Sequence, residues 1–355
     1  MTAAHINRIA TAVPPHDVHR AFVRFARTLL ADQRSVALFD RMVDKAQISH
    51  RYAVLPPSDD PEGASVDGLG VYTRGRFPST GERMRIYENH APDLAARAVA
   101  GLDLGADVRR VTHLIVTSCT GMVAPGIDHL LIDRCGLDPA VERTMVGFMG
   151  CYAAINALKL ARHIVRSEPA ARVLIVNLEL CSMHLQQTAN LEQMLSFLVF
   201  ADGAAASLVS ADPVGLAMDR FHAVVVPGTA GLITWKIRDL GFNMFLSGRV
   251  PAAIREGLHA GITSILGGTA PADIDRWAVH PGGRSVLDAV EQGLGLDPRA
   301  LAVSRDVLDA FGNMSSATVM FVLQKVLSAA APGECGCAMS FGPGLTAETM
   351  QFHRV

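Results

Sequence analysis

One cysteine of this chain stands where a helix is expected to begin, directly behind a glycine. Cys151 follows Gly147 and Gly150 in the stretch MVGFMGCYAAINALKLARHIV, residues 145–165. The N terminus of a helix carries partial positive charge that lowers the pKa of a thiol, and a preceding glycine leaves room for a substrate carbonyl. The segment therefore predicts that Cys151 is a nucleophile. A buried cysteine that packs as a small hydrophobe is the alternative.

A histidine and an asparagine stand at similar junctions farther along the chain. His280 ends an apolar run in WAVHPGGRSVLD, and Asn313 precedes an apolar run in FGNMSSATV. Together with Cys151 they would supply a nucleophile, its base and a hydrogen-bond donor for an oxyanion. We therefore expect the three to share one site. Taken singly, His280 could be a core or capping histidine and Asn313 a helix N-cap.

The elements that must position these residues can be predicted from the apolar pattern. Residues 111–119, 171–181 and 274–281 are β-branched runs typical of buried strands, and 153–165 has apolar residues at helical spacing. A strand, a helix and a strand in succession predict a parallel sheet covered by helices. His280 then lies beyond the end of its strand, where open α/β sheets bind ligands.

The rest of the chain repeats this alternation, which suggests two halves. We expect a strand within 200–213, a helix over 250–266, helices after His280 and within 313–330, and two final strands around a Gly-Pro-Gly turn. The segment 54–85 is rich in Pro, Gly and Ser and is interpreted as a surface excursion.

Composition narrows the class of protein. The 355 residues are 50% hydrophobic and 19% charged, with a net charge of −2 and a pI near 6.7, which argues against a dedicated nucleic-acid-binding protein. We predict no signal peptide and no membrane span. Six scattered cysteines indicate a reducing, cytoplasmic location. Cys335 and Cys337 have no matching pair, so they are interpreted as core thiols, and no metal site is predicted.

Several blocks of the sequence together resemble one enzyme family. They are GFMGCYAAINALKLA, FADGAAASLV, VHPGGRSVLDAVE, GNMSSATVMFVL and SFGPGLTAE, with RMVDKAQISHRY extending the match to residues 41–52. In this order they resemble the type III polyketide synthases, which are chalcone-synthase-like enzymes. The resemblance implies an α/β, thiolase-like fold of two similar αβαβα halves in a five-layered arrangement, usually as a homodimer. The halves would be residues 1–213, with the cysteine, and 214–355, with the histidine and asparagine.

The same resemblance implies a reaction. An acyl-CoA starter would load onto Cys151, extension would use decarboxylative condensation with malonyl-CoA, and the poly-β-keto chain would cyclise in the same cavity. His280 would pair with the thiol, and Asn313 and His280 would stabilise the enolate formed by decarboxylation. CoA thioesters are the substrates, so no cofactor or carrier protein is expected.

Further positions match the family's substrate-binding residues. Phe200 and Trp235 match aromatic gatekeepers between the CoA tunnel and the cavity. The cavity-lining positions would be Cys119, Thr120, Cys181, His184 and Ser315. Arg41 and Lys45 match basic residues that hold the CoA phosphates, while a third such position falls on Leu38. A solvated helix face is the alternative for these two.

Departures from plant members bear on the product. Cys119, Cys181 and His184 differ from the plant residues, and Ala124 replaces a methionine that reaches into the partner's cavity. The combination is similar to bacterial members and favours an alkyl starter with an alkylpyrone or alkylresorcinol product. The alternatives are a carrier-protein-dependent 3-ketoacyl synthase, a Cys-His-Asn hydrolase and a non-catalytic acyl-CoA binder.

Overall fold

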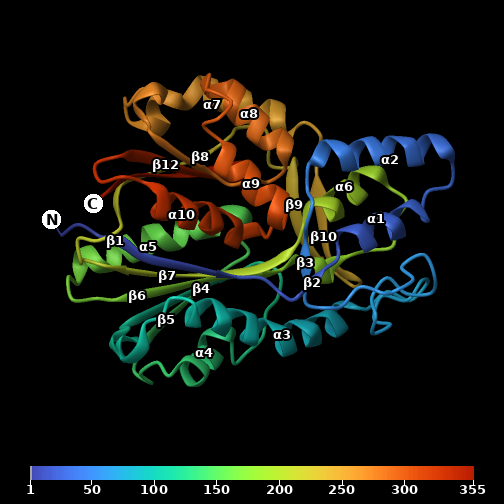
Figure 1. Ribbon diagram of the computed structural model, residues 1–355, viewed down its shortest axis with the longest axis horizontal. Helices are drawn as coiled ribbons and strands as arrows, with labels where there is room; N and C mark the ends of the chain where they lie inside the picture. The colour runs from blue at the N-terminus through green and yellow to red at the C-terminus, as the bar shows by residue number, and fades with distance from the viewer. Residues whose placement is uncertain (1) are drawn as a thin grey trace.

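The computed structural model describes residues 2–355, which form two packed α/β halves (Figure 1). One mixed sheet runs through both, in the order β11 (Arg276–Val279), β12 (Cys335–Gly342), β13 (Thr346–Arg354), β8 (Leu216–Val225), β1 (His5–Ala12), β7 (Asp202–Ser210), β6 (Val173–Leu180), β4 (His113–Ser118) and β5 (Glu142–Gly147). Only His5 and Ile6 of β1 pair with β8, so this short contact joins the two half-sheets.

Helices cover both half-sheets and fill the space between them. They are α1 (His19–Arg27), α2 (Gln33–Ala46), α3 (Thr80–Ala100), α4 (Ile127–Cys135), α5 (Ala153–Ser167), α6 (Leu191–Val199), α7 (Val250–Leu266), α8 (Arg284–Leu294), α9 (Ala302–Phe311) and α10 (Thr318–Ala329). In Figure 1 the layers follow one another as α3 and α4, the first half-sheet, α5 and α10, the second half-sheet, then α7 and α8. This is the expected five-layered thiolase-like arrangement.

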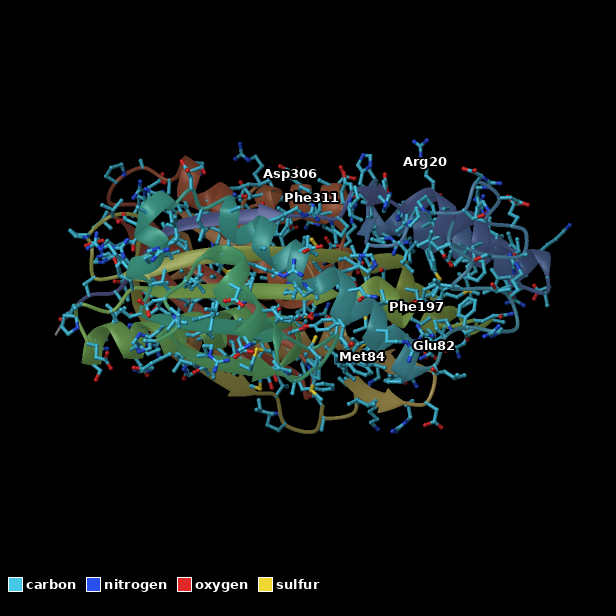
Figure 2. The ribbon with its side chains drawn as sticks, turned by 90° about the horizontal axis from the view of Figure 1, so that it is seen from below. Arg20, Glu82, Met84, Phe197, Asp306 and Phe311 are labelled. Atoms are coloured by element: carbon cyan, nitrogen blue, oxygen red, sulfur yellow. The ribbon has the colours of Figure 1, made fainter. Side chains whose placement is uncertain are left out.

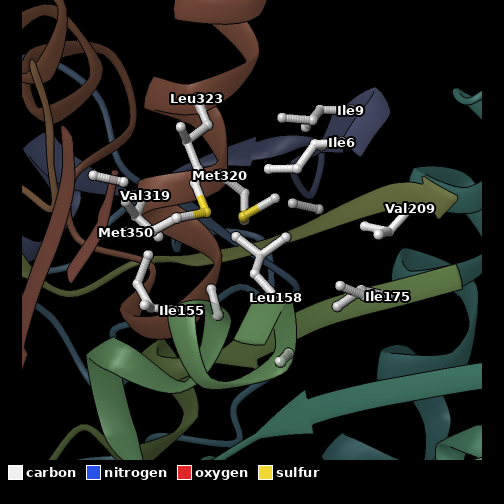
Figure 3. Packing of buried hydrophobic residues seen from close by; sticks show 14 of the residues in the cluster. Ile6, Ile9, Ile155, Leu158, Ile175, Val209, Val319, Met320, Leu323 and Met350 are labelled. Carbon is white, nitrogen blue, oxygen red and sulfur yellow. The ribbon is translucent and has the colours of Figure 1, made fainter. Parts of the chain in front are cut away.

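The middle layer is the centre of the hydrophobic core. Ile155 and Leu158 of α5 lie opposite Met320 of α10, and side chains from both half-sheets close the cluster (Figure 3). All three are fully buried. Because α5 and α10 contact both sheets, the segments just before them are fixed where the halves meet.

The chain crosses between the halves after Ser210, where β7 ends, and before Leu216, where β8 begins. The division after residue 213 stays a prediction, which this crossing supports. Within residues 2–355, no helix is both long and apolar enough to cross a bilayer.

One region agrees with the expectations and one differs. Residues 54–79 are irregular and lie mostly at the surface, as expected, while the buried Leu55, Asp67 and Tyr72 attach the segment to the body. It leads into α3, whose first turn is fixed by a reciprocal capping box between Ser79 and Glu82. Figure 2 labels Glu82 in this first turn. A separate hairpin of β9 (Ile233–Arg238) and β10 (Gly241–Leu246) was not predicted.

Candidate active site

Cys151 lies in a short 3-10 turn, Gly150–Tyr152, that leads directly into α5. Gly150 has φ of +76°, and a Cβ there would come within 2.5 Å of the Cδ atom of Pro343. Only glycine accepts that backbone angle without strain and also fits beneath the proline. The glycine before the nucleophile therefore fixes how the turn packs against the Gly-Pro-Gly loop.

His280 follows the last residue of β11, as the strand prediction required. Its backbone N–H donates to the carbonyl of Met339 at 2.8 Å, which continues the pairing with β12 by one residue. The side chain is completely buried, and among the residues that the structure describes none bonds to either ring nitrogen. Buried polar groups usually have partners, so this imidazole is exceptional.

Asn313 is oriented from both ends of its side-chain amide. Its Oδ1 accepts the backbone N–H of Ser315 at 2.8 Å, and its Nδ2 donates to the carbonyl of Gly282 at 3.1 Å. A primary amide has two N–H groups, so one remains for another acceptor. The backbone of Asn313 also pairs with Val199 and Ala201 on either side of Phe200. Asn313 is thus an N-cap-like residue with a spare donor.

The structure brings Cys151, His280 and Asn313 to the wall of one cavity of about 50 Å³. The other predicted residues on this wall are Phe200, Trp235, Cys119 and Ser315. Three loop-to-helix junctions from two halves of the molecule therefore meet at one point. The cavity offers a thiol, an imidazole and an amide N–H to a single bound molecule.

The ionisation of the first two groups differs from the sequence prediction. Burial raises the pKa of the Cys151 thiol to about 12, although hydrogen bonds from Ser315 and Asn313 act in the opposite direction. Burial also lowers the pKa of His280 to about 3. Burial acts against the expected lowering of the thiol pKa by the helix N terminus, because desolvation penalises the thiolate. In the free protein burial thus favours the neutral forms of the thiol and of the imidazole.

A second cavity shares a wall with the first. It is lined by Cys119, Thr120, Cys181, His184, Phe197, Phe200, Trp235, Met244 and Ser315. A third, of about 70 Å³, adjoins it at Cys181, Phe197 and Phe200 and extends beneath the 54–79 segment, past Leu55 and Tyr72. Phe200 borders all three cavities, and its role as a gatekeeper stays a prediction.

A buried carboxylate behind the cavity wall was missed by the sequence analysis. Glu179 near the end of β6 is fully buried, and burial raises its pKa to about 7. Its Oε2 accepts from the backbone N–H of Cys119 at 3.0 Å and from the Thr120 hydroxyl at 2.9 Å, and its Oε1 accepts from Ser316 at 2.6 Å. An acidic residue inside the apolar run VLIVNLEL was the available signal.

His184 and Trp235 attach the β9–β10 hairpin to the loop after β4. The Trp235 Nε1–H donates to the carbonyl of Cys119 at 2.7 Å. His184 Nε2–H donates to the Thr120 carbonyl at 2.7 Å, and its Nδ1 accepts the backbone N–H of Phe242 at 3.0 Å. Both nitrogens of His184 are thus engaged, and burial lowers its pKa to about 3. These contacts support a packing role for His184.

The two predicted CoA-binding residues lie apart from the cavities. Arg41 and Lys45 are exposed on the face of α2 that also carries Leu38, and within residues 2–355 neither has an ion pair. Their role therefore stays a prediction. Cys337 is buried as expected for a core thiol, but Cys335 is exposed, so that half of the expectation is wrong.

The comparisons with known proteins cover the whole chain. Residues 2–213 match the N-terminal domain of chalcone and stilbene synthases, and residues 218–355 match the C-terminal domain. The alpha-pyrone synthesis polyketide synthase-like Pks18 of Mycobacterium tuberculosis is 33% identical over 370 aligned positions, covering 99% of this chain and 91% of that protein.

Solved structures show the same fold. The C-terminal type III polyketide synthase domain of Steely1 from Dictyostelium has a TM-score of 0.89 at 26% identity, with 99% of each chain covered. PKS-I of the brown alga Ectocarpus siliculosus has a TM-score of 0.88 at 29% identity, over 100% of this chain and 99% of that one. The chain therefore belongs to the chalcone and stilbene synthase family and is a type III polyketide synthase of the bacterial kind.

Proposed function

We propose that Cys151, His280 and Asn313 carry out loading and decarboxylative condensation, and that the starter is an aliphatic acyl-CoA. The observation that carries the catalytic assignment is the buried His280, whose two ring nitrogens have no described partner in the cavity that Cys151 lines. A buried imidazole without a partner is costly to stability, so a partner supplied by substrate accounts for it.

Loading begins from the neutral pair. As Cys151 Sγ attacks the thioester carbonyl, the thiol proton passes to His280, and the tetrahedral intermediate expels the CoA thiolate, which takes that proton. The acyl group then remains on Cys151 and His280 is again neutral. Because burial favours the neutral imidazole and its ring nitrogens have no described partner, His280 has a free nitrogen that can accept the thiol proton.

Chain extension uses the hydrogen-bond donors of Asn313 and His280. Malonyl-CoA loses CO₂, and negative charge develops on its thioester oxygen. The spare N–H of Asn313 and an N–H of His280 stabilise that enolate, whose carbon attacks the acyl group on Cys151. Each such donor typically contributes on the order of 3 kcal/mol to the transition state. The released Cys151 thiolate takes up a proton.

The cavities support an aliphatic starter. Beyond Cys151 the space continues as narrow adjoining cavities past Cys181 to Leu55 and Tyr72, which suits an extended flexible chain better than a broad ring. The similar mycobacterial protein is named for alpha-pyrone synthesis. We therefore propose an alkylpyrone or alkylresorcinol product, closed while the alkyl tail occupies the third cavity.

The homodimer is proposed from an unpartnered sheet edge. β5 lies at the edge of the large sheet, pairs only with β4, and is mostly exposed. Exposed Met122, Met145 and Met149 lie on or near it, and Ala124 is exposed in the loop that follows β4. Such an edge is normally covered, and a second copy would cover it by a two-fold contact. Met145→Arg should then shift the protein to a monomer in sedimentation velocity.

Two smaller proposals remain. Arg41 and Lys45 would hold the CoA phosphates, so Arg41→Ala should raise KM for malonyl-CoA several-fold while kcat is kept. The cysteines are all unpaired, which supports a cytoplasmic location where CoA thioesters are made.

One experiment tests the function. Wild type and Cys151→Ala are incubated with radiolabelled malonyl-CoA and acyl-CoAs of graded chain length, without carrier protein, and products are identified by mass spectrometry. Labelled pyrones or resorcinols from long-chain starters, absent with Cys151→Ala, would support both proposals. Products from short starters alone would refute the aliphatic assignment, and equal product from Cys151→Ala would refute the role of the cysteine.

A further inference from the structure

The cavity with the largest volume among those described lies outside the reaction centre. It has about 410 Å³ and runs between helix α7 and the outer face of strand β8. Its walls are lined by Ala223, Val224, Val226, Pro227, Ile254, Gly257, Leu258, Ala260, Gly261, Ile265, Phe341 and Ala347, with His222 and Ser264 as its polar members. We call this space the α7–β8 groove. Its volume is in the range of small-molecule sites, roughly 300–1,000 Å³.

The groove is open because two residues of α7 that face β8 are glycines. Gly257 and Gly261 stand one helical turn apart on the lining face of α7. A Cβ at Gly257 would come within 3.3 Å of Val226, whereas at Gly261 only Ile265 would be in contact, at 3.6 Å. Glycine in a helix interior costs roughly 1 kcal/mol relative to alanine. The two glycines therefore keep open a space that almost any other residue would narrow.

The groove is separate from the reaction cavity but shares a wall with it. Ile254 and Phe341 line both spaces, while Cys151, His280 and Asn313 line only the reaction cavity. Both wall residues are almost fully buried. A molecule in the groove would thus press on the outer side of the wall that bounds the catalytic thiol.

Arg220 lies beside one end of the groove, at the last turn of α7. Arg220 donates to the carbonyls of Ser264 and Ile265, each at 2.8 Å, and no described carboxylate pairs with it. His222 lies on the same strand and lines the groove. The nearby Glu348 is already paired with Lys159 at 2.8 Å. A guanidinium has five N–H groups, so Arg220 can still donate to an anionic group placed at this end of the groove.

We propose that the α7–β8 groove is a second binding site, which takes a medium-chain fatty carboxylate. The alkyl chain lies between Val224, Leu258 and Phe341, and the carboxylate lies near His222 and Arg220. An aliphatic ligand fits because the lining is almost entirely aliphatic and small. Binding does not depend on the catalytic proposals, since it is measured without substrate.

The test uses dodecanoate and a matched pair of variants on α7. Gly261→Leu fills the groove and is compatible with the helix, since its Cβ meets no clash. Thr263→Leu adds the same side chain on the exposed side of α7 and is the control. Calorimetric titration of dodecanoate should show at least tenfold weaker binding to Gly261→Leu, unchanged binding to Thr263→Leu, and severalfold weaker binding to Arg220→Gln.

The location is checked with a diazirine-bearing dodecanoic acid and peptide mapping. Crosslinks in tryptic peptides 221–236 and 256–276, lost in Gly261→Leu, would support the site. Crosslinks confined to the peptide that contains Cys151, equal binding by wild type and Gly261→Leu, or no binding by the wild type would each overturn it.

Discussion

The residues that react and the hairpin that covers them are held in different ways. Cys151, His280 and Asn313 each follow or precede an element of the central layers, and backbone bonds to Met339, Val199 and neighbouring segments fix them from behind. Residues at such positions are held rigidly because the neighbouring core is close-packed.

The β9–β10 hairpin is held outside the large sheet, by contacts with α3 and α6 that include hydrogen bonds from Gln193 Nε2 to Asn243 Oδ1 and from the Gly241 N–H to Thr80 Oγ1. It forms its own two-stranded sheet, exposes Ile237, Leu240 and Phe245, and supplies Trp235 and Met244 to the cavity walls. Apart from side-chain packing, hydrogen bonds at Trp235 and His184 attach it beside the cavity. An isolated hairpin has marginal stability. The comparison shows that the candidate catalytic groups are fixed by the core, whereas part of the cavity wall belongs to a separately attached hairpin.

The largest expected effect comes from replacing His280, one of the groups that the core holds in place. His280→Gln removes the base but keeps an amide donor, so acylation of Cys151 should fall by about 10²–10⁴ while decarboxylation of malonyl-CoA falls less. Single-turnover mass spectrometry of the acyl-enzyme and CO₂ release measure the two steps. Equal losses in both steps would mean that His280 does not act as the base.

Asn313→Ala tests whether Asn313 is the second hydrogen-bond donor to the enolate oxygen. Loss of its spare N–H should slow decarboxylation by about 10²–10³, while acylation of Cys151 changes much less. The same two measurements apply. Asn313→Asp is the near-isosteric control, because it retains the acceptor for the Ser315 N–H but has no N–H of its own. Rapid decarboxylation by either variant would contradict the proposed role.

The next prediction asks whether the buried Glu179, behind the rigid wall of the cavity, lowers the free energy of unfolding as its carboxyl ionises. Its pKa is raised from 4.5 to about 7 in the folded state, so between these values the unfolded chain ionises first. Stability conferred by the neutral carboxyl is therefore present below pH 4.5 and lost as the pH rises through 7, by up to about 3 kcal/mol. Urea unfolding across this window should show that Glu179→Gln lacks the decline.

The control for this measurement is the exposed Glu192→Gln, which should follow the wild-type curve. If Glu179→Gln and wild type keep parallel pH dependence, the carboxyl is not the source of the decline.

The smallest effect concerns the hairpin. Trp235→Phe keeps an aromatic ring beside His184 but removes the donor to the Cys119 carbonyl. Losing one such bond costs about 1–3 kcal/mol locally, so the wall should loosen while the reacting groups stay in place. We expect a shift toward longer products with loading rates within about tenfold of wild type. Unchanged product ratios, measured by mass spectrometry with one starter, would show that the hairpin does not set chain length.

Where strong apolar periodicity exists, the sequence predicted the elements well. The helix over 250–266 is α7 with the same bounds, and the Cys151 helix is α5. The strand over 274–281 is shorter, at Arg276–Val279, because it pairs only with β12 at the sheet edge. The β9–β10 hairpin escaped prediction because its short exposed strands lack a continuous apolar face. The 54–79 segment lies mostly at the surface, as predicted, but its Pro and Gly content gave no sign that Tyr72 is buried.

The sequence by itself determined the family, the three chemical groups and their places at loop-to-helix junctions, because these follow from residue type and local pattern. Only the tertiary structure decided that burial disfavours the charged forms of Cys151 and His280, that Glu179 lies behind the cavity, and that His184 is a structural contact. Those properties depend on desolvation and on partners distant in sequence, which local pattern does not encode. The α7–β8 groove likewise appears only when two glycines of one helix face a strand from another part of the chain.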